Sequence, residues 1–327
     1  MAFRHLTKTI HHTVYPAISP SNPLNSAHGK TVIISGGASG IGYGIAQAFA
    51  AAGAATVVII ARRQVALDEA STKLCAEIAS MGNKTVVWTY LLDITKEAAV
   101  GDAFDDIRKR LNEGVEPNTQ LKDADVLVTS AAHVGQGETT LNYSPQAYRD
   151  AFETNLFGNL NLTRAFLKPE IPAIPMATLD RRAKQTSPFL HTHTHKQKII
   201  LDVSTLSTHV VFPGQATYAT SKIAFTRAMQ QLQNEVDGLP GTPIRIHSFH
   251  PGAVFTPAIA SQFGGKLEGF DWDDESLPGG FAVWLASPAA AFLKGRFLLS
   301  NWDVEELIAL KEKYEEDPEF GTLSLKT

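Results

Sequence analysis

Tyr218 and Lys222 stand four residues apart in the stretch ATYATSKI, residues 216–223. On a helix, positions i and i+4 share a face, so the phenol and the ammonium would be neighbours. A neighbouring positive charge favours the phenolate and would lower the pKa of Tyr218. Such a pair could donate a proton near neutral pH. Because the same spacing also occurs on ordinary exposed helix faces, its meaning depends on the rest of the chain.

A glycine-rich turn, SGGASGIG at residues 35–42, follows the β-branched run KTVIISG and opens a helical apolar pattern. This is the context that a dinucleotide-binding turn requires. Glycines let the backbone approach a pyrophosphate, and the helix N-terminus presents free N–H groups to it. The alternative is a flexible glycine-rich loop. The residues expected to contact the cofactor here are Ser35, Gly36, Ser39, Gly40, Ile41 and Gly42.

The next strand-like run ends in Ile60-Ala61-Arg62-Arg63. An acid at this point holds the ribose 2′-hydroxyl of NAD, whereas an arginine accommodates a 2′-phosphate. The acid is absent here, and guanidinium groups bind phosphate bidentately. Arg62 and Arg63 therefore favour NADP(H) over NAD(H) as cofactor. A solvated arginine pair on a loop is the alternative.

Strand-like and helical segments alternate through the chain. Strand-like runs include ATVVIIARR, KTVVWTYLL, ADVLVTSA, QKIILDVS and PIRIHSFH, and helical patterns separate them. Continuous apolar strands that alternate with helices indicate a parallel sheet covered on both faces. We expect a single α/β domain over residues 30–300, with a doubly wound, Rossmann-like sheet. An irregular arm (1–29) would precede it and a tail (301–327) would follow it.

Two stretches interrupt this alternation. Residues 169–196 are predicted to form an inserted surface loop. Its alternating histidines, His191, His193 and His195, lack the acidic or cysteine partners of a metal site, so no metal is expected. Residues 257–280 follow the last strong strand and form a candidate substrate lid, since such segments border the crevice of an open α/β sheet. Aromatic residues in and beside it suit a bulky apolar ligand or simple packing.

Composition excludes several classes of function. The chain has 327 residues and a formal charge of −4, so nucleic acid is not an expected partner. No apolar run is long enough to cross a membrane. The single cysteine, Cys75, fits a reducing compartment and is expected to be a packing residue. The acid-poor first 29 residues are broken by prolines, which suits an arm better than a targeting helix and favours a cytoplasmic address.

Taken together, these motifs resemble the short-chain dehydrogenase/reductase family over about residues 30–300. The glycine turn is similar to the family's TGxxxGIG, with Ser35 in place of threonine. LLDIT is similar to the acid motif near the adenine ring, and TNLFG to the segment with the catalytic asparagine. The later motifs are YxxxK and a proline–glycine loop. By resemblance the added site residues are Asp93, Ile94, Asn155, Pro251, Gly252, Val254 and Thr256.

The sequence departs from the family at two places. The family's NNAG appears as Thr129-Ser130-Ala131-Ala132, so Ser130 and Ala131 would line the cofactor site in its place. The family's catalytic serine aligns with Thr205, which keeps the hydroxyl. Ser204 is the reserve candidate.

The resemblance implies reversible carbonyl–alcohol oxidoreduction with NADP(H). Thr205 and Tyr218 would hydrogen-bond the substrate oxygen, and Tyr218 would transfer the proton. Lys222 would lower the Tyr218 pKa and bind the nicotinamide ribose, while Asn155 would hold a water in a proton relay. The front YPAISPSNPL and the end WDVEEL resemble members from filamentous fungi, which implies a ketoreductase of secondary metabolism.

Other functions remain compatible with these motifs. A redox-neutral enzyme, such as an isomerase, dehydratase or cyclase, could retain NADP on this scaffold, and so could a non-catalytic NADP sensor. The set of Tyr218, Lys222 and Asn155 argues against a sensor, which needs no proton donor. The resemblance also implies a homodimer or homotetramer that pairs through helices at about 145–167 and 215–235.

Overall fold

A computed structural model describes residues 5–114, 122–135, 137–168, 197–237, 244–263, 265, 269 and 271–323. Within these ranges, seven strands form one parallel sheet in the order β3-β2-β1-β4-β5-β6-β7. The strands are β1 (Thr31–Ser35), β2 (Thr56–Ala61), β3 (Val86–Leu91), β4 (Val126–Thr129), β5 (Lys198–Val203), β6 (Ile244–His250) and β7 (Phe297–Leu299). The expected doubly wound α/β fold is confirmed.

The inner strands are the apolar, β-branched runs of the sequence. In β1, Ile33 pairs with Val58 on one side and with Leu127 on the other, and all three are fully buried. Strands covered on both faces must be apolar on both faces, which explains their continuous rather than alternating pattern. Each such side chain stabilises the fold by about 1.5–3 kcal/mol through burial.

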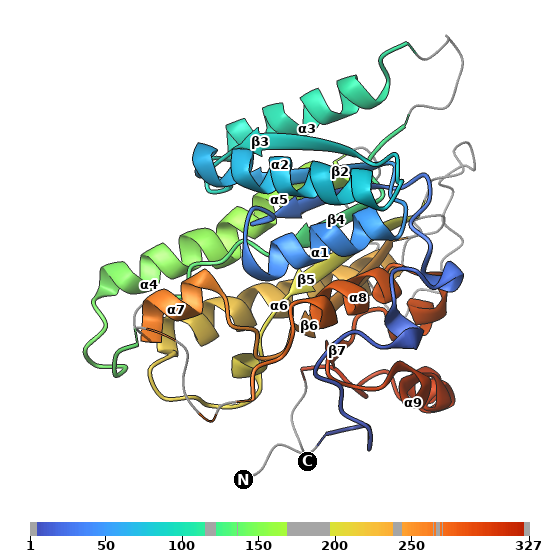
Figure 1. Cartoon of the computed structure of the whole chain (residues 1–327). Coiled ribbons are helices and arrows are strands. Elements are labelled where there is room, and N and C mark those ends of the chain that lie inside the picture. Colours follow the sequence, from blue (N-terminus) through green and yellow to red (C-terminus); the bar gives the residue numbers. More distant parts are fainter. Residues whose placement is uncertain are drawn as a thin grey trace, which may run out of the picture.

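Helices cover both faces of the sheet (Figure 1). The helices α1, α2 and α8 share one buried apolar cluster, and α3, α5 and α6 share the other. The helices are α1 (Gly40–Ala51), α2 (Gln64–Ser80), α3 (Glu97–Leu111), α4 (Pro145–Phe152), α5 (Asn159–Leu167), α6 (Ala216–Asp237), α7 (Pro257–Phe263), α8 (Ser276–Leu285), α9 (Val304–Ala309) and α10 (Lys311–Glu316). None of the described helices is long and apolar enough to span a membrane.

The end of the expected lid belongs to the core instead. Residues 276–280 begin α8, which packs closely on α1 because both helices carry glycine at their crossing. A Cβ on Gly279 would lie 2.7 Å from the Gly44 carbonyl oxygen. Leu277 is fully buried there. Only the part of the segment before α8 can therefore act as a lid.

The described segments near the two ends of the chain lie side by side (Figure 1). Ile10 forms an antiparallel bridge with Trp302, and His11 Nε2 lies 2.8 Å from Asp303 Oδ2. Trp302 and Tyr314 join the cluster of α1 and α8, so part of the tail is core. Strand β7, which the sequence analysis did not identify, completes the sheet between this tail and β6. Cys75 on α2 is exposed, so its expected packing role was wrong.

Candidate active site

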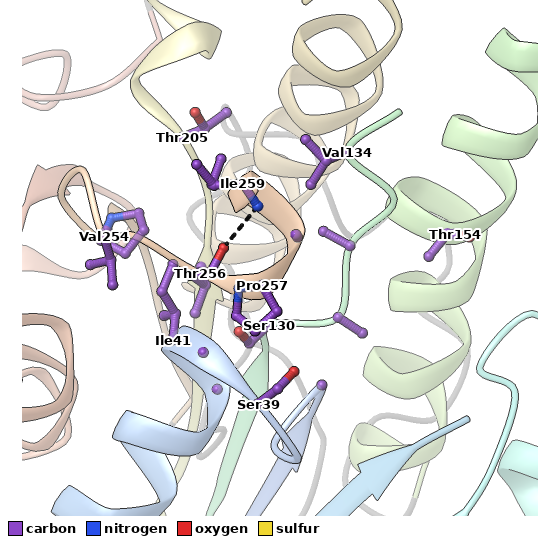
Figure 2. Close-up of a pocket in the computed structure, with 18 of the residues that line it drawn as sticks. Ser39, Ile41, Ser130, Val134, Thr154, Thr205, Val254, Thr256, Pro257 and Ile259 are labelled. Atoms are coloured by element: carbon purple, nitrogen blue, oxygen red, sulfur yellow. Dashed lines mark hydrogen bonds between the residues drawn. The ribbon is translucent and has the colours of Figure 1, made fainter. Parts of the chain in front are cut away.

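A cavity of about 1030 Å³ opens at the carboxyl ends of β1, β2, β4, β5 and β6. Figure 2 shows labelled side chains around it from the glycine turn, the β4 and β5 ends and the segment after β6. In a doubly wound sheet this edge, where the strand order reverses between β1 and β4, is the ligand crevice. All the residues predicted for the site line this cavity except Ser35, Asn155 and Lys222, which are buried behind its wall.

The glycine turn has no room for a side chain at Gly36 or Gly42. A Cβ on Gly42 would lie 2.3 Å from the Gly36 carbonyl oxygen, and a Cβ on Gly36 would lie 2.9 Å from Ala131 Cα. Ser39 precedes α1, and its side chain makes no capping hydrogen bond. The first N–H groups of α1 therefore lack a side-chain acceptor, as a phosphate site requires. This turn fits the pyrophosphate of a dinucleotide.

Two exposed arginines at the end of β2, Arg62 and Arg63, line the same cavity as the glycine turn. Arg62 and Arg63 line the cavity and make no ion pair with any residue in the described ranges. Asp93 faces the same end, and Thr95 donates to its Oδ1 from the backbone N (3.0 Å) and from Oγ1 (2.9 Å). Partial burial opposes ionisation of Asp93, but these hydrogen bonds and the Lys96 and Arg62 charges lower its pKa. Unpaired guanidinium groups suit a 2′-phosphate.

Ser35 has a structural role rather than a place in the cavity wall. It is fully buried, it accepts a hydrogen bond from Ala131 N (3.2 Å), and its Oγ donates to Val128 O (3.4 Å). The hydroxyl thus joins β1 to the end of β4. Ala131 and Ser130 line the cavity beyond it. The TSAA segment, which departs from the family's NNAG, is held in this way.

Thr205 and Tyr218 meet at the far end of the cavity. The Thr205 side chain lies close enough to the Tyr218 phenol to oppose the rise in its pKa, and Thr205 Oγ1 donates to Ser207 Oγ at 3.2 Å. Ser207 in turn donates to Gln215 Oε1. Ser204, the reserve candidate, is 2.6 Å from Thr226 Oγ1 on the buried side of α6. The geometry therefore favours Thr205 as the hydroxyl partner of Tyr218.

The Lys222 ammonium is held by groups of β5. Its Nζ donates to Val203 O at 2.6 Å and lies 3.8 Å from Asp202 Oδ1, with both side chains buried. Burial lowers the pKa of Lys222, and the Asp202 carboxylate partly offsets this. Burial also raises the pKa of Tyr218 to about 12, and the Thr205 side chain opposes this rise only in part. The predicted lowering of the Tyr218 pKa is therefore wrong for this arrangement, because the ammonium is paired with Val203 and Asp202.

Asn155 lies in a π-helical turn, Glu153–Gly158, between α4 and α5. Its Oδ1 accepts from His133 N (2.7 Å), and its Nδ2 donates to His133 O (2.9 Å) and Ser221 Oγ (2.9 Å). The side chain thus ties the loop after β4 to α6, beside Lys222. Such π turns within α-helices frequently occur at functional sites.

The proline–glycine loop closes the cavity from the side of β6. Gly252 has φ +92°, and Thr256 approaches the glycine turn, where a Cβ on Gly40 would lie 3.0 Å from its Cγ2. Thr256 Oγ1 also accepts from Ile259 N at 3.3 Å, the dashed line in Figure 2. The loop and the glycine turn thus form adjoining walls.

Several lining residues were missed by the sequence analysis. Ser207 and Gln215 extend the Thr205 network, and His250 directly precedes Pro251. His250 Nδ1 accepts from Leu206 N at 3.2 Å, and burial lowers its pKa to about 4, so the ring is neutral near pH 7. The signal for His250 was its place at the end of β6; for Gln215 no local pattern existed.

No cluster of metal-ligating side chains occurs within the described ranges. His191, His193 and His195, with the whole predicted insert at 169–196, lie outside them. Phe270 also lies outside, whereas Trp272 lines the cavity.

Comparison with known proteins gives relatives along the whole chain. The family model "short chain dehydrogenase" matches residues 30–172. A short chain dehydrogenase/reductase from Aspergillus novofumigatus, nsrO, is 36% identical over 98% of this chain and 96% of its own. One from Claviceps purpurea is 36% identical over 98% and 94%, and AacuD from Aspergillus aculeatus is 32% identical over 99% and 98%.

Solved structures share the fold at lower identity. A 3-ketoacyl-(acyl-carrier-protein) reductase from Brucella melitensis, complexed with NADH, has a TM-score of 0.64 at 22% identity and covers 84% of this chain and 97% of its own. A short chain dehydrogenase from Shigella flexneri, complexed with NADP, has a TM-score of 0.63 at 18% identity, with 85% and 99% covered. The fold is thus compatible with either nicotinamide cofactor.

Proposed function

The chain belongs to the short-chain dehydrogenase/reductase family, and we propose that it is an NADP(H)-dependent oxidoreductase that interconverts a carbonyl and an alcohol by hydride transfer. The observation that carries the proposal is that Thr205 and Tyr218 together line one end of a cavity whose other end holds Arg62 and Arg63. Between them lies the glycine turn, which fits a pyrophosphate.

The chain's own residues would orient and polarise the substrate. When bound, NADPH supplies the hydride. The Thr205 and Tyr218 hydroxyls would donate to the carbonyl oxygen, where negative charge develops. With its pKa raised to about 12, Tyr218 stays protonated at neutral pH and can then give its proton to that oxygen. This protonation state favours reduction over oxidation near pH 7.

We propose NADP(H) rather than NAD(H) as the cofactor. The support is the unpaired state of Arg62 and Arg63 within the described ranges, together with the absence of an acid at the end of β2. The cofactor-facing residues would be the glycine turn, Arg62, Arg63, Asp93 with Ile94, Ser130 with Ala131, and the loop from Pro251 to Thr256.

The substrate would be a neutral, largely apolar carbonyl compound. Among the described residues that line the cavity, Arg62, Arg63 and Asp93 are the charged ones, and all three lie at the adenine end. The wall around Tyr218 carries apolar side chains: Val134, Leu206, Phe212, Ile259 and Trp272. An anionic substrate would find no cation there. Given the fungal relatives, we extend the proposal to a cytoplasmic ketoreductase of secondary metabolism.

We also propose pairing between copies of the chain through the surface of α4, α5 and α6. Its support is exposed apolar area: Phe157 is 51% exposed and Ile223 is 38% exposed. Large apolar side chains that stay exposed together often mark an interface.

The test is NADPH oxidation, followed optically, against a panel of neutral ketones, quinones and polyketide-like carbonyls, with Tyr218→Phe beside the wild type. We expect at least one neutral carbonyl to be reduced and Tyr218→Phe to lower kcat by about 10²–10⁴-fold with little change in NADPH binding. NADPH binding without oxidation by any panel member would instead favour an isomerase, dehydratase, cyclase or sensor that retains NADP.

A further inference from the structure

Asp273, in the segment between α7 and α8, is hydrogen-bonded to the proline–glycine loop. Its Oδ2 accepts from Ala253 N at 2.6 Å, and its own N donates to Ala253 O at 2.9 Å. A parallel bridge joins it to Val254. A Cβ on Gly252 would lie 2.5 Å from Asp273 Oδ2, so the carboxylate lies directly against the glycine. Gly252 both adopts φ +92° and leaves room for this contact.

The other carboxylate oxygen accepts hydrogen bonds from the N-terminal arm and from the segment after β7. Asp273 Oδ1 accepts from His12 Nδ1 at 2.6 Å and from Asn301 Nδ2 at 3.0 Å. Two hydrogen bonds to backbone carbonyls of the arm join the same segments: Asp274 N donates to His12 O at 2.8 Å, and Asn301 Nδ2 donates to His11 O at 2.9 Å. One buried side chain thus joins the N-terminal arm, the segment after β7 and the loop at the cavity.

These contacts satisfy a carboxylate that would otherwise be costly to bury. The Asp273 side chain is 4% exposed and makes no ion pair with a lysine or arginine of the described ranges. A buried carboxylate needs hydrogen-bond donors on both oxygens. Ala253 N donates to Oδ2 of Asp273, and His12 of the arm and Asn301 donate to Oδ1. Without His12, the carboxylate would be drawn towards water and away from Ala253.

We propose that Asp273 is a positioning residue for the Pro251–Gly252 loop and that the N-terminal arm, through His12, is a working part of the active site. The proposal rests on the proposed function, in which this loop borders the nicotinamide end of the cofactor. The sequence gives no local signal for it, because residues 12, 273 and 301 meet only in the fold. Its consequence is selective: binding at the nicotinamide end depends on the arm, and binding at the adenine end does not.

Adjacent histidines give a matched pair of variants. His12 reaches the loop through Asp273, whereas His11 contacts Asp303 of the tail and does not reach the loop. Three single variants separate the roles: His12→Ala removes the donor, His12→Asn keeps a donor near the Nδ1 position, and His11→Ala loosens the arm alone. Asp273→Asn, which removes the charge and one acceptor, is the stronger perturbation of the loop.

Two probes separate the ends of the site: NADPH, and 2′-phospho-ADP, which lacks the nicotinamide and its ribose. Dissociation constants are measured by titration calorimetry on the full chain, with thermal unfolding alongside. We expect His12→Ala to weaken NADPH about fivefold and Asp273→Asn about tenfold or more, since hydrogen bonds to a charged group are lost. Binding of 2′-phospho-ADP should stay within about twofold, His12→Asn should recover most of the affinity, and His11→Ala should leave both constants unchanged.

Other results would overturn the proposal. If His12→Ala raised the dissociation constants of both probes equally, or left that of NADPH unchanged, the arm would have a structural role only. If Asp273→Asn fails to fold, the His12 series still decides, because its side chain is 59% exposed and tolerates replacement. If the wild type binds neither probe, the proposed function itself fails, which is a different outcome.

Discussion

Arg62 and Arg63 are the residues on which cofactor choice would rest. They are exposed, they line the adenine end of the cavity, and they form no ion pair within the described ranges, although the Arg62 charge acts on Asp93. We expect the double variant Arg62→Ala/Arg63→Ala to bind NADPH about 10–100-fold more weakly, because charge-assisted hydrogen bonds to phosphate would be lost. NADH binding should change little. Titration of both cofactors measures the ratio.

Arg149→Ala is the matched control, since Arg149 is an exposed arginine on α4 that does not line the cavity. It should leave both dissociation constants unchanged. Equal losses for NADPH and NADH in the double variant would show that the arginines support the fold of the β2 end rather than a 2′-phosphate.

Single residues also show how far sequence reasoning reaches at this scale. Most of the motif residues line one cavity, because each motif ends a strand or opens a helix at the same edge of the sheet. The direction of a side chain was harder to predict. Lys222 shares a helix face with Tyr218, yet its ammonium contacts Val203 O and Asp202. Both partners belong to β5, so these contacts depend on how β5 packs against α6. Spacing along a helix does not contain that information.

Among the elements, strands and helices with strong apolar patterns were predictable, and short ones were not. Strand β7 has three residues, too few for any periodicity, and it is defined by pairing with β6. The start of α8 carries Pro278 and two glycines, which resemble a loop in sequence. Packing against α1 makes it a helix, because small residues there allow the close approach.

Helix α1 offers an element-scale prediction through its glycines. A Cβ at Gly42 would lie 2.3 Å from the Gly36 carbonyl oxygen, so Gly42→Ala must displace the turn. We expect it to lower the free energy of unfolding by about 1–3 kcal/mol and to weaken NADPH binding at least tenfold. Thermal unfolding and cofactor titration measure the two effects.

Gly101→Ala on α3 is the matched control. A Cβ there would meet nothing within 4 Å, so the substitution should raise the free energy of unfolding by about 0.5–1 kcal/mol through helix propensity. Cofactor binding should not change. If Gly42→Ala bound NADPH like the wild type, the turn could not be the pyrophosphate site.

At the scale of the whole molecule, the two chain ends close over one face of the sheet and reach the active site. The arm pairs with the segment after β7 at Ile10 and Trp302, and Glu306 Oε2 and Oε1 accept from Lys8 N (2.7 Å) and Thr9 N (2.9 Å). The sequence predicted an arm lying on the domain but not its partner, because the contact joins residues almost 300 positions apart. Only the closed fold brings them together.

Acid stability is a property of the whole fold to which the buried histidine His247 should contribute strongly. His247, on β6, is fully buried, and its Nδ1 donates to Leu293 O at 3.1 Å. Burial, with the charge of Arg245 beside it, lowers its pKa from 6.5 to about 3. Below pH 6.5 the unfolded chain binds a proton at this site and the folded chain does not. Stability should therefore fall with decreasing pH from about 6.5 towards 3, by about 1.4 kcal/mol per pH unit for this group.

The test is urea unfolding of the wild type, His247→Asn and His28→Asn at several pH values between 7 and 4. His247→Asn should be less stable at pH 7, because a buried ring and its hydrogen bond are lost, yet its stability should fall less steeply with acid. His28 is exposed, so its variant should keep the wild-type slope. The slope rather than the absolute stability is decisive: parallel curves for wild type and His247→Asn would mean that other groups carry the acid sensitivity, with His250, also held neutral by burial, the next to replace.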